Sequence, residues 1–247
     1  MDVVYMKEYS HALGRDMEYK VYGHAGKPCI VFPAQNGRFY DYEDFGMVEV
    51  LKPWIESGKL MLFCVDSLDI ESWSAYGAEK ARIERHESWY HYIVDEFLRR
   101  VYDFDPFGGR PFLTGCSMGA SHALNFYLRR PELFSGCIAL SGIYHATYFF
   151  PNYQDYRIYL NSPVDYLVHM STDHPYLDEY RNGKIIVCVG RGAWEEEGII
   201  DADIIRHELM RLDVPAWIDY WGEDVAHDWP WWKKQIVYFM PYMLDEK

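Results

Sequence analysis

The sequence predicts an α/β protein with a mostly parallel central sheet and helices on both faces. Short apolar runs rich in β-formers alternate with longer segments whose apolar residues have helical spacing. Strands joined through helices run parallel, and right-handed crossovers place the helices on both faces of the sheet. The chain has 247 residues, and we expect one domain with a large core over residues 1–247.

The start of the chain departs from this alternation. Val3–Tyr9 and Met17–Tyr22 are strand-like and are separated only by a turn around Gly14-Arg15-Asp16, which predicts an antiparallel edge to the sheet. Further strands are predicted at Pro28–Pro33, Leu60–Asp66, Pro111–Gly115, Gly136–Ser141, Lys184–Gly190 and Ala216–Trp221. Helices are predicted at Tyr42–Glu56, Glu79–Tyr102, Met118–Arg129, Asp203–Leu212 and Trp231–Leu244. We expect Pro53 to distort the last turn of the first helix.

One long stretch, residues 144–182, is rich in aromatic residues and shows no clear strand. In a doubly wound sheet, an insertion after the carboxyl end of a strand lies over the ligand crevice. The sequence therefore predicts a small helical cap or pocket wall here.

The charge and cysteine content narrow the classes of partner. With 24 basic and 38 acidic residues the formal net charge is −14, which disfavours nucleic acid and anionic membrane surfaces as partners. The five cysteines are odd in number, show no C-x-x-C spacing and mostly occupy apolar runs, so we expect reduced thiols. The start of the sequence lacks signal-peptide features and no apolar run could span a bilayer, which favours the cytoplasm.

The sharpest motif is Gly115-Cys116-Ser117-Met118-Gly119, which follows a predicted strand and opens a predicted helix. This strand–turn–helix context distinguishes a nucleophile elbow from a chance G-x-S-x-G. The glycines remove side chains that would collide with neighbouring backbone, and the helix start places N–H groups beside the serine. Ser117 is therefore the predicted nucleophile.

A serine hydroxyl needs a base within hydrogen-bond reach, and the base needs an acid to orient it. Of ten histidines, His227 is favoured because it follows the last predicted strand and precedes the closing helix. His122 points away from the serine on the helix leaving the elbow, and His145 comes too early in the chain order. The acid should follow the strand Lys184–Gly190; Glu195 is the first choice and Glu196 the second.

Two backbone donors should stabilise the negative charge that develops on the substrate. The N–H of Met118 is one, since it directly follows the nucleophile. The second should come from the loop after the strand Pro28–Pro33, where Gln35 is preferred and Ala34 and Asn36 stay open.

With these residues the chain resembles the putative esterase family of α/β-hydrolases, which includes feruloyl and acetyl-xylan esterases, S-formylglutathione hydrolases and mycolyltransferases. The resemblance covers the opening residues 13–22, the elbow, the acid loop Gly192–Glu195 and His227-Asp228-Trp229. It implies an α/β-hydrolase fold and the same roles for Ser117, His227, Glu195 and Met118. The loop after the first parallel strand lacks the His-Gly that relatives often carry, and the acid is Glu where many members use Asp.

The expected activity is hydrolysis of a small-molecule ester through an acyl-enzyme. Acyl transfer by the same residues, and a non-catalytic binding protein on a hydrolase-like fold, are the alternatives. Four aromatic residues are candidates for the substrate pocket: Trp194, Trp229, Tyr148 and Phe149. We expect no cofactor and no metal, because the sequence shows neither a Gly-rich phosphate loop nor H-E-x-x-H spacing. An exposed apolar cap would be compatible with a homodimer.

Overall fold

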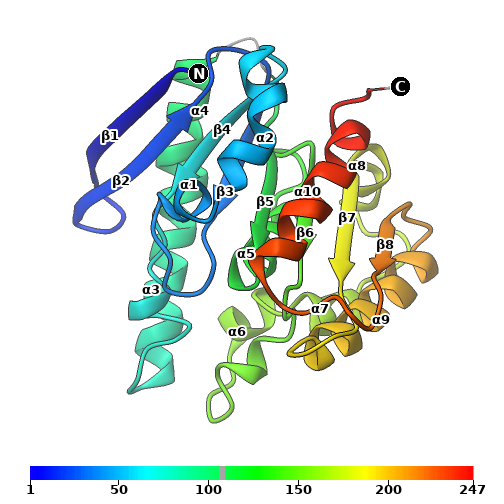
Figure 1. Cartoon of the computed structure of the whole chain (residues 1–247). Helices are drawn as coiled ribbons and strands as arrows, with labels where there is room; N and C mark the ends of the chain where they lie inside the picture. Colours follow the sequence, from blue (N-terminus) through cyan, green and yellow to red (C-terminus); the bar gives the residue numbers. More distant parts are fainter. Residues whose placement is uncertain (106–108, 247) are drawn as a thin grey trace.

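A single eight-stranded sheet forms the centre of the molecule (Figure 1). The computed structural model describes residues 1–105 and 109–246. The strands lie in the order β1-β2-β4-β3-β5-β6-β7-β8. Their bounds are β1 Val3–Ser10, β2 Arg15–Tyr22, β3 Lys27–Phe32, β4 Leu60–Val65, β5 Phe112–Cys116, β6 Gly136–Leu140, β7 Lys184–Val189 and β8 Trp217–Tyr220.

The predicted fold class is confirmed. β1 pairs with β2 and β2 with β4 in antiparallel registers, whereas every pair from β4 to β8 is parallel. The predicted antiparallel edge therefore consists of β1 and β2, which are joined by the turn that contains Gly14 (φ 65°).

Helices cover both faces of the sheet because successive residues of each inner strand point to opposite sides. On one face Val31, Leu62 and Ile138 pack with helices α1 (Asp41–Asp44), α2 (Met47–Glu56) and α10 (Trp229–Met243). On the other face Ile30, Phe63 and Ala139 pack against a second layer of helices. That layer comprises α3 (Glu79–His91), the π-helical η2 (Tyr92–Phe97), α4 (Leu98–Phe104), α5 (Met118–Arg129), α7 (Pro163–Val168), α8 (Leu177–Asn182) and α9 (Glu196–Arg211).

The helices predicted at Tyr42–Glu56 and Asp203–Leu212 have different bounds in the structure. The helix predicted at Tyr42–Glu56 is two helices, because Gly46 adopts a left-handed conformation (φ 77°) between them. Pro53 lies inside α2, which continues to Glu56. The helix predicted at Asp203–Leu212 starts at Glu196, where two acidic residues in the first turn complement the helix dipole.

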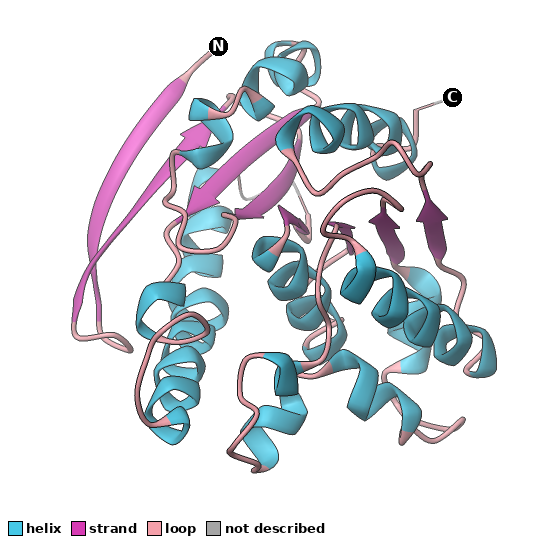
Figure 2. Ribbon diagram, turned by 60° about the horizontal axis from the view of Figure 1, so that its bottom comes forward, coloured by secondary structure: helices cyan, strands magenta, loops and turns pink. Residues whose placement is uncertain are grey.

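The first part of the segment 144–182 forms short helices at the carboxyl edge of the parallel strands (Figures 1 and 2). These are the 3-10 turn η3 (Ala146–Tyr148), α6 (Tyr156–Leu160) and α7, whereas α8 directly precedes β7 and lies at the opposite, amino edge. A second 3-10 turn, η1 (Asp69–Glu71), follows β4 at the same edge. The carboxyl ends of β3, β5, β6 and β7, with their loops, are thereby gathered into one region, which is where doubly wound sheets bind ligands.

All five cysteines are buried free thiols. Burial raises the pKa of the Cys137 thiol to about 12, which keeps it protonated and poorly reactive. No helix within residues 1–105 and 109–246 combines the length and apolar character needed to cross a membrane.

Candidate active site

Ser117 occupies a sharp turn between β5 and α5. Its backbone angles, φ 56° and ψ −123°, are strained for a residue with a side chain, a cost of about 1–3 kcal/mol that neighbouring structure must sustain. The turn is fixed by a hydrogen bond from the Ser117 N–H to the Leu140 carbonyl, 2.9 Å away in β6. It also depends on two glycines: a Cβ on Gly115 would lie 2.4 Å from the Gly119 carbonyl carbon, and one on Gly119 would lie 2.4 Å from the Phe32 oxygen.

The structure brings the side chains of Ser117, His227 and Glu195 together. His227 Nε2 lies 2.8 Å from Ser117 Oγ, and His227 Nδ1 lies 3.4 Å from Glu195 Oε2. Because an ionised carboxylate only accepts hydrogen bonds, the geometry assigns the imidazole proton to Nδ1 and leaves Nε2 to accept from the serine hydroxyl. The longer Nδ1–carboxylate distance is common in unliganded sites of this type.

The loops that carry Glu195 and His227 are joined by backbone hydrogen bonds. Gly192 N–H donates to Val225 O at 2.9 Å, and His227 N–H donates to Ala193 O at 3.0 Å. A side chain on Gly192 would collide with the Val225 carbonyl, 2.7 Å from its Cβ. The two loops, which follow β7 and β8, therefore form one backbone-paired unit.

Glu195 is almost fully buried, with 1% of its surface exposed, whereas Glu196 and Glu197 are exposed. Its Oε1 accepts a hydrogen bond from the Ser141 hydroxyl at 2.7 Å, and Ser141 Oγ accepts one from the Trp232 indole at 3.0 Å. The carboxylate therefore has a partner on each oxygen, and Glu195 rather than Glu196 faces the histidine.

Sequence reasoning missed the contribution of Ser141 and Trp232. Ser141 has a left-handed backbone (φ 59°) directly after β6, and its hydroxyl connects Trp232 of α10 to Glu195. The ring of Trp232 also packs edge-on against His227, with centroids 4.9 Å apart. A serine at the carboxyl end of a predicted strand was visible in the sequence, but nothing local indicated that it would meet a residue 54 positions later.

The loop after β3 faces the serine from the other side. Gln35 and Met118 both line the cavity at Ser117, and within the described chain neither backbone N–H donates to another residue. The other two candidates, Ala34 and Asn36, are not among the described residues that line this cavity.

This loop is held by the segment that follows β4. Asp66 Oδ1 accepts from Arg38 Nε at 2.8 Å and from the Phe39 N–H at 2.9 Å, and Ser67 Oγ donates to the Gly37 carbonyl at 3.1 Å. Burial raises the pKa of Asp66 above its ordinary value, against the opposing effect of Arg38. Asp66 and Ser67 therefore fix the loop that carries Gln35.

A cavity of about 360 Å³ opens over the serine. Tyr148, Phe149 and Trp194 line it, as three of the four predicted pocket aromatics. Trp229 does not: it faces the other side of α10's first turn, where its ring stacks on Phe45 with centroids 4.4 Å apart. Trp194 stands at the mouth with 85% of its surface exposed and a left-handed backbone (φ 70°).

Residues 10–243 match the family described as putative esterase. The chain belongs to this family. As a member of this family, the chain is an ester hydrolase by class. The resemblance to the putative esterase family that its motifs indicated is confirmed. No curated protein matches the chain at a significant level.

Solved structures with the same fold as this esterase-family chain cover nearly all of it. A ferulic acid esterase is 18% identical with a TM-score of 0.77, and the match covers 99% of this chain and 98% of the other. The fluorophosphonate-binding serine hydrolase F of Staphylococcus aureus, with substrate bound, is 17% identical with a TM-score of 0.74 and 98% coverage of both chains. An S-formylglutathione hydrolase from Agrobacterium tumefaciens is 13% identical with a TM-score of 0.77, covering 99% and 95%. At these identities the matches establish the fold.

Two other histidines that were weighed as the base, His122 and His145, are engaged elsewhere. His122, buried on α5, hydrogen-bonds Asp69 of η1 through Nε2 at 2.9 Å. His145 hydrogen-bonds Asp201 of α9, whose carboxylate also accepts from the His145 N–H at 3.1 Å. The hydrogen bond to Asp201 raises the pKa of His145. Neither histidine is directed at Ser117.

We find no group of three or more His, Cys, Asp or Glu side chains that could hold a metal ion in the portion of the chain that the structure describes.

Proposed function

We propose that the chain hydrolyses a carboxylic ester through a covalent acyl-enzyme on Ser117. The observation that supports this most strongly is the 2.8 Å separation of Ser117 Oγ and His227 Nε2 at a strained strand–helix turn. A hydroxyl in hydrogen-bond contact with a neutral imidazole can lose its proton as it attacks a carbonyl carbon.

In the first half of the reaction, Ser117 Oγ forms a bond to the ester carbonyl carbon while His227 Nε2 takes the hydroxyl proton. The tetrahedral intermediate collapses, the C–O bond to the alcohol breaks, and His227 returns the proton to the departing alkoxide oxygen. In the second half a water molecule attacks the acyl carbon, His227 takes its proton, and the acid is released as Ser117 recovers its own.

In this proposal Glu195 orients His227 and stabilises its charged form. Its buried carboxylate, 3.4 Å from Nδ1, holds the imidazole in the orientation that presents Nε2 to the serine. It also stabilises the imidazolium that forms when the proton is taken. The hydrogen bond from Ser141 to the other carboxylate oxygen keeps Glu195 from turning away.

The N–H groups of Met118 and Gln35 are proposed to bind the oxyanion. Both line the cavity at Ser117, and donors of this kind act where charge develops in the transition state. The loss of one such donor costs about 3 kcal/mol in other serine enzymes.

The size of the cavity bears on the substrate. At about 360 Å³ it lies near the lower end of the range for small-molecule sites, and its aromatic wall of Tyr148 and Phe149 is apolar. We therefore propose small esters with short acyl groups as substrates, with hydrolysis of p-nitrophenyl acetate and butyrate faster than that of the octanoate.

The test compares release of p-nitrophenol from these three esters by wild type and Ser117→Ala. Labelling by a fluorophosphonate probe, with the modified peptide located by mass spectrometry, locates the reactive residue independently of the chosen ester. Turnover and labelling by wild type alone support the proposal. Equal turnover by Ser117→Ala, or labelling of another residue, contradicts it.

A further inference from the structure

A second and larger cavity lies at the opposite end of helix α5 from Ser117. It has a volume of about 540 Å³ and shares no lining residue with the cavity at the serine. Ser117 precedes α5 and Arg129 ends it, so the helix of 12 residues separates the two by about 18 Å. A small substrate held at Ser117 therefore does not reach the second cavity.

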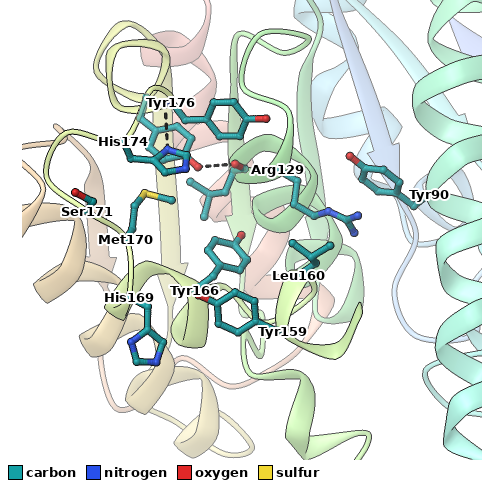
Figure 3. Close-up of a pocket in the computed structure, with 12 residues that line it drawn as sticks. Tyr90, Arg129, Tyr159, Leu160, Tyr166, His169, Met170, Ser171, His174 and Tyr176 are labelled. Carbon is teal, nitrogen blue, oxygen red and sulfur yellow. Dashed lines mark hydrogen bonds between the residues drawn. The ribbon is translucent and has the colours of Figure 1, made fainter. Parts of the chain in front are cut away.

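The walls of this cavity are mostly aromatic and come from several parts of the chain (Figure 3). Tyr159 of α6 stacks on the His169 ring at a centroid distance of 6.4 Å and meets the Tyr166 ring of α7 edge-on at 6.3 Å. Tyr176 meets the neighbouring His174 ring edge-on, with centroids 5.1 Å apart. Concave sites of 300–1,000 Å³ with mainly apolar and aromatic walls are typical of small-molecule binding.

The charge in the cavity is already neutralised. Among the described residues that line it, Arg129 is the only one with a permanent charge. Its guanidinium donates two hydrogen bonds to Glu87, at 2.9 and 3.0 Å, and lies 3.7 Å from the centroid of the Tyr90 ring. An anion would find its counter-charge occupied, and no carboxylate among the described lining residues is available to pair with a cation.

Few polar groups remain for a ligand. The Tyr166 hydroxyl donates to Asn125 and the Tyr180 hydroxyl to the Leu128 carbonyl. Within the described residues, the hydroxyls of Tyr159 and Tyr176 and the imidazole of His169 make no hydrogen bond. A sugar, with a hydroxyl on nearly every carbon, would bury several of them without a partner, which is costly.

We propose that this cavity is a second ligand site, separate from the catalytic serine, for a neutral aromatic ring that carries one or two hydroxyl groups. The ring packs edge-to-face and offset against the tyrosine and histidine rings, which is the geometry that aromatic pairs prefer. Its hydroxyl exchanges hydrogen bonds with Tyr159, Tyr176 or His169. The proposal is independent of the chemistry at Ser117.

The test is a titration of the full chain with 4-hydroxybenzyl alcohol, followed by NMR line shifts of the ligand. The double variant Tyr159→Ala/His169→Ala removes two rings from the wall, and both residues are exposed, so folding should be preserved. Tyr156→Ala is the matched control, because Tyr156 also lies exposed on α6 but does not line the cavity.

We expect saturable binding that the double variant weakens by about tenfold or more and that Tyr156→Ala leaves unchanged. Absence of saturable binding overturns the proposal. Equal affinities in wild type and both variants also overturn it, because a ligand bound at another place does not respond to the loss of Tyr159 and His169. Tighter binding of methyl β-glucoside or 4-hydroxybenzoate than of the neutral phenol overturns the assignment of ligand class.

Discussion

The hydroxyl of Ser141 lies 2.7 Å from Oε1 of Glu195, on the side of the carboxylate that faces away from His227. Ser141 comes from the end of β6 and Glu195 from the start of α9. The contact therefore connects the centre of the sheet to the acid of the proposed triad. It gives the buried carboxylate a hydrogen bond that does not depend on the histidine.

We predict that Ser141→Ala lowers kcat by about tenfold, equivalent to about 1.4 kcal/mol, because Glu195 loses this donor and orients His227 less well. It should also destabilise the fold by about 1–3 kcal/mol, since the buried Trp232 indole loses its acceptor. Steady-state kinetics and urea denaturation measure the two effects. The control is Ser135→Ala, just before β6, whose hydroxyl has no hydrogen-bond partner in the described structure. Equal effects of both variants would count against the proposed role.

Glu195 and Glu196 are adjacent but differ in burial, which makes them a matched pair. We predict that Glu195→Gln lowers kcat by roughly 10⁴-fold, the loss seen when a triad acid becomes an amide and favours the wrong imidazole tautomer. Glu196→Gln should retain wild-type kinetics because its side chain is exposed. Ester hydrolysis with both variants decides between them. A large loss in Glu196→Gln with none in Glu195→Gln would contradict the assignment.

Trp194 combines a strained backbone with an exposed ring at the mouth of the cavity. Trp194→Gly and Trp194→Ala both remove the ring, and we expect a similar rise in KM with little change in kcat. Only glycine relieves the left-handed conformation, so Trp194→Gly should be more stable than Trp194→Ala by about 1 kcal/mol. Thermal denaturation tests the stability difference. Equal melting temperatures would show that φ at this position is not a source of strain.

His86 is buried and neutral in the native protein. Trp73 donates to its Nδ1 at 2.8 Å, so Nε2 carries the proton and donates to Asn161 Oδ1 at 3.0 Å. Burial, with a smaller effect of His122, lowers the pKa of His86 from 6.5 to about 3. The unfolded chain therefore binds a proton below pH 6.5 that the native chain does not. The contribution of neutral His86 to the free energy of unfolding is complete above pH 6.5. It is lost as the pH falls towards 3, by up to about 1.4 kcal/mol per pH unit.

We therefore predict that the unfolding free energy of His86→Gln falls less steeply between pH 6.5 and pH 3 than that of wild type. Urea denaturation at several pH values measures this slope. His91→Gln, on the same helix but exposed, should follow the wild-type curve. A His86→Gln curve parallel to that of wild type would show that His86 titrates normally in the native state.

The sequence was most informative where structure is determined locally. The strand–turn–helix around Ser117 was predictable because all three signals meet within a dozen residues, and the helix Met118–Arg129 has the predicted bounds. The break at Gly46 was not predictable from apolar spacing, which continues across it. Trp229 is an aromatic candidate for the pocket in the sequence, yet α10 turns its ring towards Phe45. Ser141 and the second cavity depend on residues that come together only when the sheet and the helices pack.

The pairing of the acid and base loops has a consequence for the newly made chain. Proteins leave the ribosome from the N-terminus, so the strands around Ser117 are available to fold while the loop that carries His227 is still being made. On the proposed mechanism, a nascent or truncated chain that ends before residue 227 holds a serine with no base to activate it. Esterase activity should therefore switch on late in synthesis, and its appearance would report that the C-terminal part of the molecule has docked.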